Sequence, residues 1–541
     1  MNLKAGAIKN TIQKFPVSVF LWCFFFVFVI VPVFFVLSSI HISDFSQLFS
    51  TTTFFSALKN TAVECVCSTF LSVAVGYVYA YAVVRGNIPL RHLFALLPVV
   101  HMITPPFVGG LSFILLFGRQ GFITKSILGL DVSLYGFWGL LISQTLCFFP
   151  IAYLMCAQSI KGINPSYEQS AKSMGSGKWK IFKTITFPLS FAGISSSFLF
   201  IAVSVLSDFG NPLIVGGRFK VLSVEIYTQL TGWLNSGVSA VLGLMLLVPS
   251  IFLFILQYNL LKKNSQKIAT VGEKTFAKSD IGVSKTVSVL LTVFCSVISL
   301  IILAQVLSIV AGAFQKLWGI NKSFTLNHIK SVLKFKHELV NSIRFAFFAS
   351  VLATIIASVT AYLNQRSSDK LTRGLDAVCQ LPAAIPGSLF GLAFLYTSNF
   401  FHINWSSFLI IMVMTVSYIP FSYRICSASF SKLKISLDEA AYSLGSSKIK
   451  VLADIIFPLS TGGLFSSFTY VFARGVGTLS SVIFLTGFNT GLSSVKIMNL
   501  AEQGDWGKSA ALALVLTLFT FIIVGAGNFV SRKFSPKIYE Q

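Results

Sequence analysis

The chain has 541 residues, of which 55% are hydrophobic and only 11% charged, and its mean hydropathy is +0.80. Soluble globular proteins do not reach such a composition, which excludes a soluble enzyme or binding domain. The formal net charge of +24 would suit a nucleic-acid partner. However, the lysines and arginines gather in every second loop between apolar runs, as the positive-inside rule requires of cytoplasmic loops. We expect a polytopic helical membrane protein with both termini in the cytoplasm and no nucleic-acid partner.

The apolar runs define the expected membrane spans, because roughly 20 mostly apolar residues cross the ~30 Å hydrocarbon core of a bilayer. About twelve runs satisfy this requirement. They cover residues 17–39, 61–83, 93–117, 134–158, 189–206, 238–261, 287–310, 340–363, 375–396, 407–426, 459–481 and 509–530. The sequence therefore predicts an all-α membrane protein.

A polar stretch divides these spans into two groups of equal number. We expect a first repeat at 1–261, a cytoplasmic linker at 262–285 and a second repeat at 286–541. Because each half has an even number of spans, both halves enter the membrane from the same side. Such repeats are parallel and related by a pseudo-two-fold axis along the membrane normal, where a solute pathway is expected.

Prolines interrupt the third and ninth expected spans. Pro105 and Pro106 lie in the third span, and Pro382 and Pro386 lie in the ninth. A proline cannot donate a backbone hydrogen bond, so these helices should kink or break. The interruption either shapes local packing or provides a flexible element beside the pathway.

One short polar loop occurs twice, near residues 164–188 and 434–458. Gln169-Ser170-Ala171 followed by Gly175 in the first copy matches Glu439-Ala440-Ala441 followed by Gly445 in the second. Asn164-Pro165 and Ser436 are expected to start a short helix in each copy, with Ser436 as the N-cap. Each glycine allows the left-handed turn that ends a helix. A membrane chain that repeats such a loop repeats a surface that touches a partner outside the membrane.

These loops resemble the EAA loop of binding-protein-dependent ABC importer permeases, whose pattern is Glu-Ala-Ala, three residues and Gly, ending in Ile-x-Leu-Pro. The second copy departs from it only at Phe457, whereas the first has Gln169 and Ser170 in place of the Glu and the first Ala. Glu168 is a candidate for the missing acid. The resemblance implies the type I importer fold in a bacterial inner membrane. It also implies that each loop helix is a coupling helix seated on a cytoplasmic ATPase subunit.

Two loops in one chain then imply two ATPase subunits, together with an extracytoplasmic solute-binding protein. The residues expected at the ATPase contact are Glu168, Gln169, Ser170, Ala171, Gly175, Glu439, Ala440, Ala441 and Gly445. On this resemblance ATP is bound by the partner subunits, and the chain itself binds no cofactor.

Other segments are similar to fused ferric-iron permeases. They are Thr104–Gly110, Gly118–Gly121, Asp208–Pro212 and Thr478–Leu485. The resemblance implies ferric iron as the solute. Permeases for aminoalkylphosphonate, thiamine and polyamines share parts of these motifs and stay as alternatives.

Ionisable residues near the ends of spans are candidates for the pathway, because charges inside a membrane are costly and often functional. Asp208 lies near the outer end of the fifth span, and Arg474 lies about one turn deeper in the eleventh. With Asn211 and Thr478 they are expected to form a gate or a solute contact, the alternative being exposure at the outer interface. Glu64 with Arg344 suggests a structural ion pair.

No motif indicates an enzyme. Gly175-Ser176-Gly177-Lys178 resembles the end of a phosphate-binding loop, but Trp179 stands where Ser or Thr belongs. No combination of Tyr, His and carboxylates predicts a tight metal site, and no catalytic constellation is present. An ion-coupled secondary transporter is the rival class; it needs coupling carboxylates near the membrane midplane, where the spans carry few acids.

Overall fold

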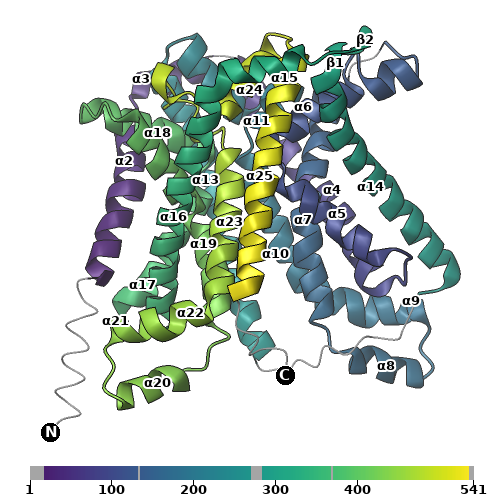
Figure 1. Ribbon diagram of the computed structural model, residues 1–541, viewed down its shortest axis with the longest axis vertical. Helices are drawn as coiled ribbons and strands as arrows, with labels where there is room; N and C mark the ends of the chain where they lie inside the picture. Colours follow the sequence, from purple (N-terminus) through teal and green to yellow (C-terminus); the bar gives the residue numbers. More distant parts are fainter. Residues whose placement is uncertain (1–16, 51, 132–133, 270–282, 367–369, 535–541) are drawn as a thin grey trace. The chain divides into compact units, whose positions relative to one another are not determined.

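The computed structural model describes residues 17–50, 52–131, 134–269, 283–366 and 370–534. Within these ranges, ten helices are long and apolar enough to cross a membrane, and up to twelve spans result if two sharply bent helix pairs each count as one. This confirms the expected helical membrane architecture (Figure 1). The two termini and the middle of the expected linker, 270–282, lie outside the described residues.

The chain forms two compact units that do not follow the sequence repeats. Unit 1 contains Met1–Ile40, Lys334–Lys496 and Val515–Gln541, and unit 2 contains His41–Leu333 and Ile497–Leu514. The first span thus packs with residues of the second repeat. Each unit contains one complete copy of the repeated loop.

Unit 2 is built from helices and one short hairpin. Its elements are α3 (Ile42–Phe49), α4 (Thr52–Arg85), α5 (Arg91–Ile103), α6 (Pro106–Phe117), η2 (Phe122–Ile127), α7 (Phe137–Lys161), α8 (Pro165–Ser173), α9 (Lys178–Ile181), η3 (Phe182–Thr186), α10 (Phe187–Leu206), α11 (Gly210–Val215), α12 (Leu222–Tyr227), η4 (Thr228–Gly232), α13 (Ser236–Ala269), α14 (Lys285–Phe314), β1 (Gln315–Leu317), β2 (Asn321–Phe324) and α15 (Asn327–Val332). The central helices α4, α7 and α10 pack against one another.

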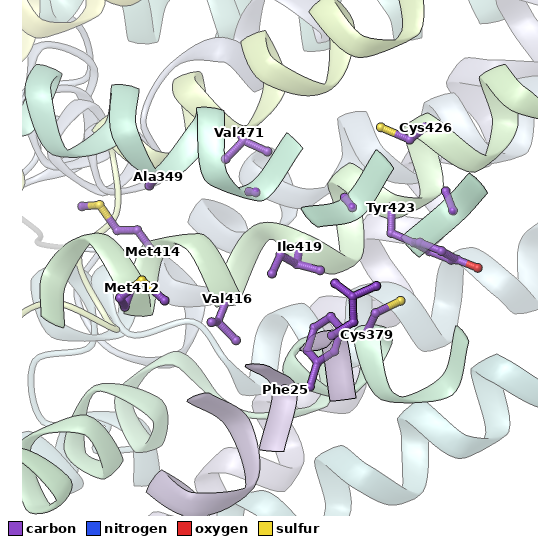
Figure 2. Packing of buried hydrophobic residues seen from close by; sticks show 14 of the residues in the cluster. Phe25, Ala349, Cys379, Met412, Met414, Val416, Ile419, Tyr423, Cys426 and Val471 are labelled. Atoms are coloured by element: carbon purple, nitrogen blue, oxygen red, sulfur yellow. The ribbon is translucent and has the colours of Figure 1, made fainter. Parts of the chain in front are cut away.

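Unit 1 repeats this arrangement of central helices with α16, α19 and α23. Its elements are η1 (Phe26–Ile30), α2 (Val31–Ser38), η5 (Leu333–Phe335, at the unit boundary), α16 (Lys336–Arg366), α17 (Lys370–Gln380), η6 (Leu381–Ala384), α18 (Gly387–Phe400), α19 (Ser406–Phe430), α20 (Ser436–Ser443), α21 (Lys448–Val451), η7 (Leu452–Ile456), α22 (Phe457–Leu459), α23 (Thr461–Val476) and η8 (Phe488–Thr490). Two more helices, α24 (Ser493–Glu502) and α25 (Trp506–Phe534), have residues in both units. Figure 2 shows the apolar core of unit 1, where Met414 and Ile419 of α19 lie among buried neighbours.

The proline interruptions break both helices, as predicted. Pro105 and Pro386 have the same backbone angles, φ −56° and ψ 137°, which no helix can continue. In unit 1 the helices on the two sides of this break meet at a bend of 101°. The run expected at 93–117 is therefore not one continuous helix: α5 ends at Ile103, and the candidate membrane span covers Phe107–Ile127, which contains α6 and η2.

The eleventh expected span, 459–481, also differs from the structure. Its helix is bent by 70° next to Ser460 and ends at Val476. The small residues after Val476 adopt turns rather than helix. Hydropathy alone does not separate a buried apolar turn from a helix, which explains the difference.

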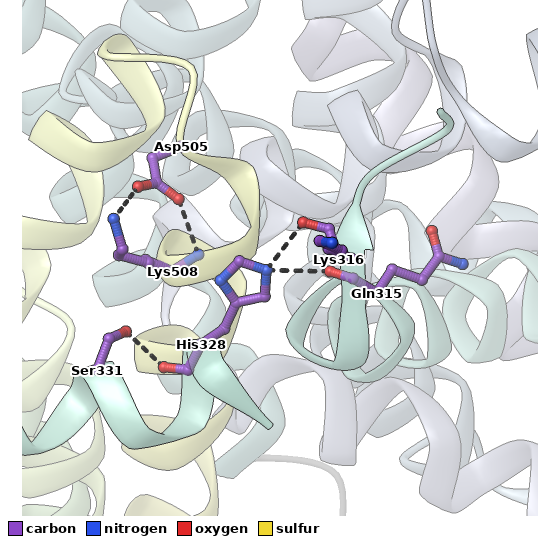
Figure 3. Close-up of polar contacts among 6 residues, drawn as sticks. All are labelled: Gln315, Lys316, His328, Ser331, Asp505 and Lys508. Atoms are coloured by element: carbon purple, nitrogen blue, oxygen red, sulfur yellow. Dashed lines mark hydrogen bonds and ion pairs between the residues drawn. The ribbon is translucent and has the colours of Figure 1, made fainter. Parts of the chain in front are cut away.

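A hairpin and a short helix follow α14 in unit 2. The strands β1 and β2 pair antiparallel. His328 of α15 holds its Nε2 atom 3.0 Å from Gln315 O and 3.3 Å from Lys316 O (Figure 3). This contact fixes the hairpin to α15.

Candidate functional site

The first repeated loop forms the short helix α8 between α7 and α10 (Figure 1). Asn164 caps it, because its Oδ1 atom accepts the backbone N–H of Ser166 at 3.0 Å. Pro165 occupies the first helical position, where the missing N–H costs nothing. The helix ends at Ser173, and Gly175, two residues later, stops it with a φ of +81°. Both ends therefore lie where the sequence predicts them.

The second loop forms α20 with a different start. The sequence predicts Ser436 as the N-cap, but Ser436 is the first helical residue, and the cap position falls on Ile435. Ile435 already has helical backbone angles, and its carbonyl accepts the N–H of Asp438 at 3.0 Å, so the first turn begins one residue earlier. Gly445 ends this helix with a φ of +82°, as predicted.

The two helices end in the same hydrogen-bonded turn. Ser176 donates its backbone N–H to Ala171 O at 3.0 Å, and Ser446 donates to Ala441 O at the same distance. This bond closes a left-handed glycine turn of the Schellman type and satisfies carbonyls that the helix end would leave free. The two loops thus share a backbone geometry although their sequences have diverged.

Replacing Gly175 by alanine should strain this turn, whereas replacing Gly177 should not. A Cβ atom added to either glycine would have open space around it, with no other atom within 4 Å, but only Gly175 has a positive φ. A left-handed alanine costs about 1–2 kcal/mol. We expect faster protease cleavage of the loop in Gly175→Ala and the wild-type rate in Gly177→Ala. Equal rates would contradict a structural role for the positive φ.

The side chains of the two loops follow one burial pattern. In both loops the first two residues of the Glu-Ala-Ala motif are exposed, and the third is buried. The exposed residues are Gln169, Ser170, Glu439 and Ala440, and the buried ones are Ala171 and Ala441. Apolar side chains are also exposed in each loop, among them Tyr167 (48%) and Met174 (79%) in the first and Leu437 (40%) and Leu444 (87%) in the second. Each loop therefore presents an apolar surface beside a polar one.

Glu168 does not belong to that exposed surface. Its side chain is buried, and its carboxylate lies 3.3 Å from the Nε atom of Arg85 at the end of α4. Thr186 donates its hydroxyl to the same carboxylate at 2.8 Å. The geometry gives Glu168 an internal partner on α4, so any part it has in coupling acts by holding α8 in place.

The second repeat contains the same ion pair between Asp438 and Arg366, at 3.0 Å. Arg366 ends α16, as Arg85 ends α4. Burial raises the pKa of Asp438, and the neighbouring Arg366 guanidinium opposes that rise. The Oδ1 atom of Asp438 has no hydrogen-bond partner in the described structure, because Ile456 stands where the first repeat has Thr186.

Unit 2 brings two of the expected pathway residues together. Asn211 donates from its Nδ2 atom to Asp208 Oδ2 at 2.9 Å, and Gln144 donates from Nε2 to the same oxygen at 3.0 Å. Gln144 also donates to Glu64 Oε1 at 2.6 Å. The sequence interpretation missed Gln144, because an amide inside an apolar run has no local signal.

Unit 1 brings together the other two. The hydroxyl of Tyr418 lies 3.1 Å from Arg474 O and 2.7 Å from Thr478 Oγ1. Asp208 and Arg474 belong to different units, so the gate pair stays a prediction. The same holds for the expected pair of Glu64 with Arg344, whose guanidinium lies over the Phe345 ring at 5.1 Å.

Comparison with known proteins identifies the family. The family described as "Binding-protein-dependent transport system inner membrane component" matches residues 68–266 and 351–536, and each match contains one of the two loops. The chain is 31% identical to the ferric transport system permease protein FbpB of Actinobacillus pleuropneumoniae, over 84% of this chain and 69% of that protein.

Two proteins of Haemophilus influenzae are also similar. The putative ferric transport system permease protein FbpB 1 is 30% identical over 76% of this chain and 67% of its own length. The Fe(3+)-transport system permease protein FbpB 2 is 22% identical over 89% of this chain and 90% of its own length. The chain therefore belongs to the inner membrane components of binding-protein-dependent transport systems, as the two-repeat permease of an ABC importer.

Proposed function

We propose that this permease carries ferric iron, delivered by an extracytoplasmic binding protein and driven by two cytoplasmic ATPase subunits. The similarity to ferric transport permeases over most of the chain supports the solute. Family membership sets aside the ion-coupled secondary transporter. Aminoalkylphosphonate, thiamine and polyamine importers stay as alternatives for the solute.

The duplicated loop carries the proposal of two ATPase subunits. Exposed apolar side chains of this size are a feature of protein interfaces. The side chains of Met174 and Leu444 occupy equivalent places after the last helical turn and are 79% and 87% exposed. With the exposed motif residues at 169–170 and 439–440, each forms a separate surface for one ATPase subunit. Both loops, and both termini, then face the cytoplasm.

On this proposal the chain has no ATP site and binds no cofactor of its own. Gly175 and Gly177, which gave the loop its likeness to a phosphate-binding motif, serve as a helix terminator and as the exposed residue before α9. The α8 side chains couple ATP hydrolysis on the partner to movement of the permease. Rigid-body motion of packed helices is a known route for such coupling.

Transport by a reconstituted complex tests the proposal. The tagged chain would be purified with its ATPase and placed in proteoliposomes with the iron-loaded binding protein, and uptake of radioactive iron would be measured with and without ATP. We expect ATP-dependent iron uptake that an excess of thiamine or spermidine does not reduce. ATP-dependent uptake of one of the other solutes, with none of iron, would overturn the ferric assignment.

A further inference from the structure

The two halves of the chain can be matched position by position through equivalent hydrogen bonds. In the first half Leu222 donates its backbone N–H to Thr61 Oγ1 at 2.9 Å. In the second half Ser493 donates its backbone N–H to Ser342 Oγ at 2.8 Å. These bonds make Thr61 of α4 equivalent to Ser342 of α16. The same offset makes Arg85 equivalent to Arg366, and both form ion pairs at the other ends of these helices.

A second pair of bonds aligns the turns after α10 and α23. Ser223 donates its hydroxyl to Asp208 O at 2.8 Å, and Ser494 donates its hydroxyl to Thr478 O at 2.6 Å. Asp208 therefore occupies the place that Thr478 has in the other half. By the same alignments, the second-half positions equivalent to Glu64, Gln144 and Asn211 are Phe345, Met414 and Ser481.

The first half thus has a polar cluster where the second half has apolar or small side chains. Figure 2 shows Met414 inside the apolar core of unit 1. Phe345 is 1% exposed, and Glu64 at the matching position is 3% exposed. Since the same helical framework packs with phenylalanine and methionine at these places, the acids and the amide are not required by the fold.

Keeping two carboxylates in this place is costly, because a buried charge needs compensation. Within unit 2, no described lysine or arginine forms an ion pair with Glu64 or Asp208; the ion pairs present there join other residues. The Gln144 amide donates to both carboxylates, with its Nε2 atom 2.6 Å from Glu64 Oε1 and 3.0 Å from Asp208 Oδ2. Asp208 also accepts from Asn211 Nδ2 at 2.9 Å. Both amides are neutral, so they offset two carboxylate charges only in part.

The Gln144 amide is itself unsatisfied. The residue is fully buried, and its Oε1 atom has no hydrogen-bond partner in the described structure. This oxygen belongs to the amide group whose nitrogen lies between the two carboxylates. Rotation of the amide would exchange the places of Nε2 and Oε1. Oε1 would then face the carboxylates of Glu64 and Asp208, so that oxygens of all three residues could bind one ligand.

The cluster lies far from the coupling loop of the same unit. Glu64 and Arg85 are both on α4, 21 positions apart in the sequence (85 − 64), which at ~1.5 Å per residue places them about 32 Å apart along the helix. Arg85 holds the coupling helix. Because the coupling loop faces the cytoplasm on the proposed function, Glu64 lies towards the opposite side, where a solute enters.

We propose that Glu64, Asp208 and Gln144 form a transit site for a hard multivalent cation in the first half of the permease. Carboxylate and amide oxygens are the ligands that hard cations prefer. A site with few ligands binds its cation weakly enough to release it, which suits passage rather than storage. The assignment rests on the proposed function, since it makes the cation the transported solute.

Isosteric amides test the site. Glu64→Gln and Asp208→Asn keep the shape and the oxygen that accepts from Gln144 but remove the charge. In the proteoliposome assay we expect at least a tenfold fall in iron taken up per ATP hydrolysed, with ATPase association and thermal stability unchanged. Met414→Leu, at the position equivalent to Gln144, is the matched control and should transport like the wild type.

Three other outcomes would overturn an assignment. If both variants import iron at the wild-type rate, the cluster is not a transit site, while the ferric function stands. If the variants lose ATPase association and melt earlier, the cluster is structural. If the wild-type complex takes up another solute instead of iron, the proposed function fails irrespective of the variants.

Discussion

Replacing Arg366 by alanine should uncouple ATP hydrolysis from transport and destabilise the second coupling loop by about 3–5 kcal/mol, the usual cost of leaving one member of a buried ion pair alone. Asp438 already has one oxygen without a partner, and Arg366 supplies the described ion pair at 3.0 Å. Without the guanidinium, α20 loses its ion pair with the end of α16 and keeps the hydroxyl contact of Tyr442 with Tyr362 at 3.4 Å. We expect at least a tenfold loss of solute transported per ATP, measured in proteoliposomes, and faster protease cleavage within 434–458.

The reason for this effect can be isolated with a second substitution. Asp438→Asn in the Arg366→Ala background removes the buried charge and should recover most of the protease resistance. Thr186→Val in the first loop is the control, because it removes one hydrogen bond and keeps the Arg85–Glu168 pair, and the second repeat already has an aliphatic residue there. Wild-type coupling in Arg366→Ala would refute the role of the pair.

Replacing both Met174 and Leu444 by glutamate should abolish association with the ATPase while leaving the permease folded. Both side chains are largely exposed, so a charge there costs the isolated chain little. At an apolar interface, by contrast, a buried unpaired carboxylate is strongly unfavourable. Each single substitution should weaken association less than the double one, because the unchanged loop keeps its own docking surface. Co-purification with the tagged ATPase measures this effect.

Phe488→Glu is the matched control for that experiment. Phe488 is fully exposed, so it gives the same change from an apolar to an acidic surface outside both coupling loops. It should co-purify the ATPase like the wild type. If Phe488→Glu reduces association as much as the double variant does, the effect is a general one of surface charge, and the docking surface lies elsewhere.

Much of the coupling loop could be predicted because its signals are local. Asn164-Pro165 and the two glycines act on the backbone of their own segment, and the structure places helix ends there. The break at Pro105 follows from proline chemistry in the same way. The prediction for Ser436 is wrong by one residue, because a serine near a helix start fits either the cap or the first turn.

The parts that the sequence did not reveal depend on contacts between distant segments. Which of Glu168 and Gln169 faces the protein is decided by Arg85, which lies more than two helices away in the chain. Gln144 was not recognised because the carboxylates that it contacts come from α4 and from the turn after α10. Aligning the two repeats would have marked both arginines, since each ends the helix that contains the second expected span of its half.

The covalent joining of the two halves has a consequence for how such a protein can vary. A permease assembled from two copies of one shorter polypeptide would carry every side chain twice, so that an acid at position 64 would necessarily have a twin. In a single chain, each half mutates on its own. One half can keep Phe345 and Met414 for packing while the other gives the equivalent places to Glu64 and Gln144. In a fused chain, residues that stabilise one half can therefore stay unchanged while the equivalent residues of the other half acquire polar groups.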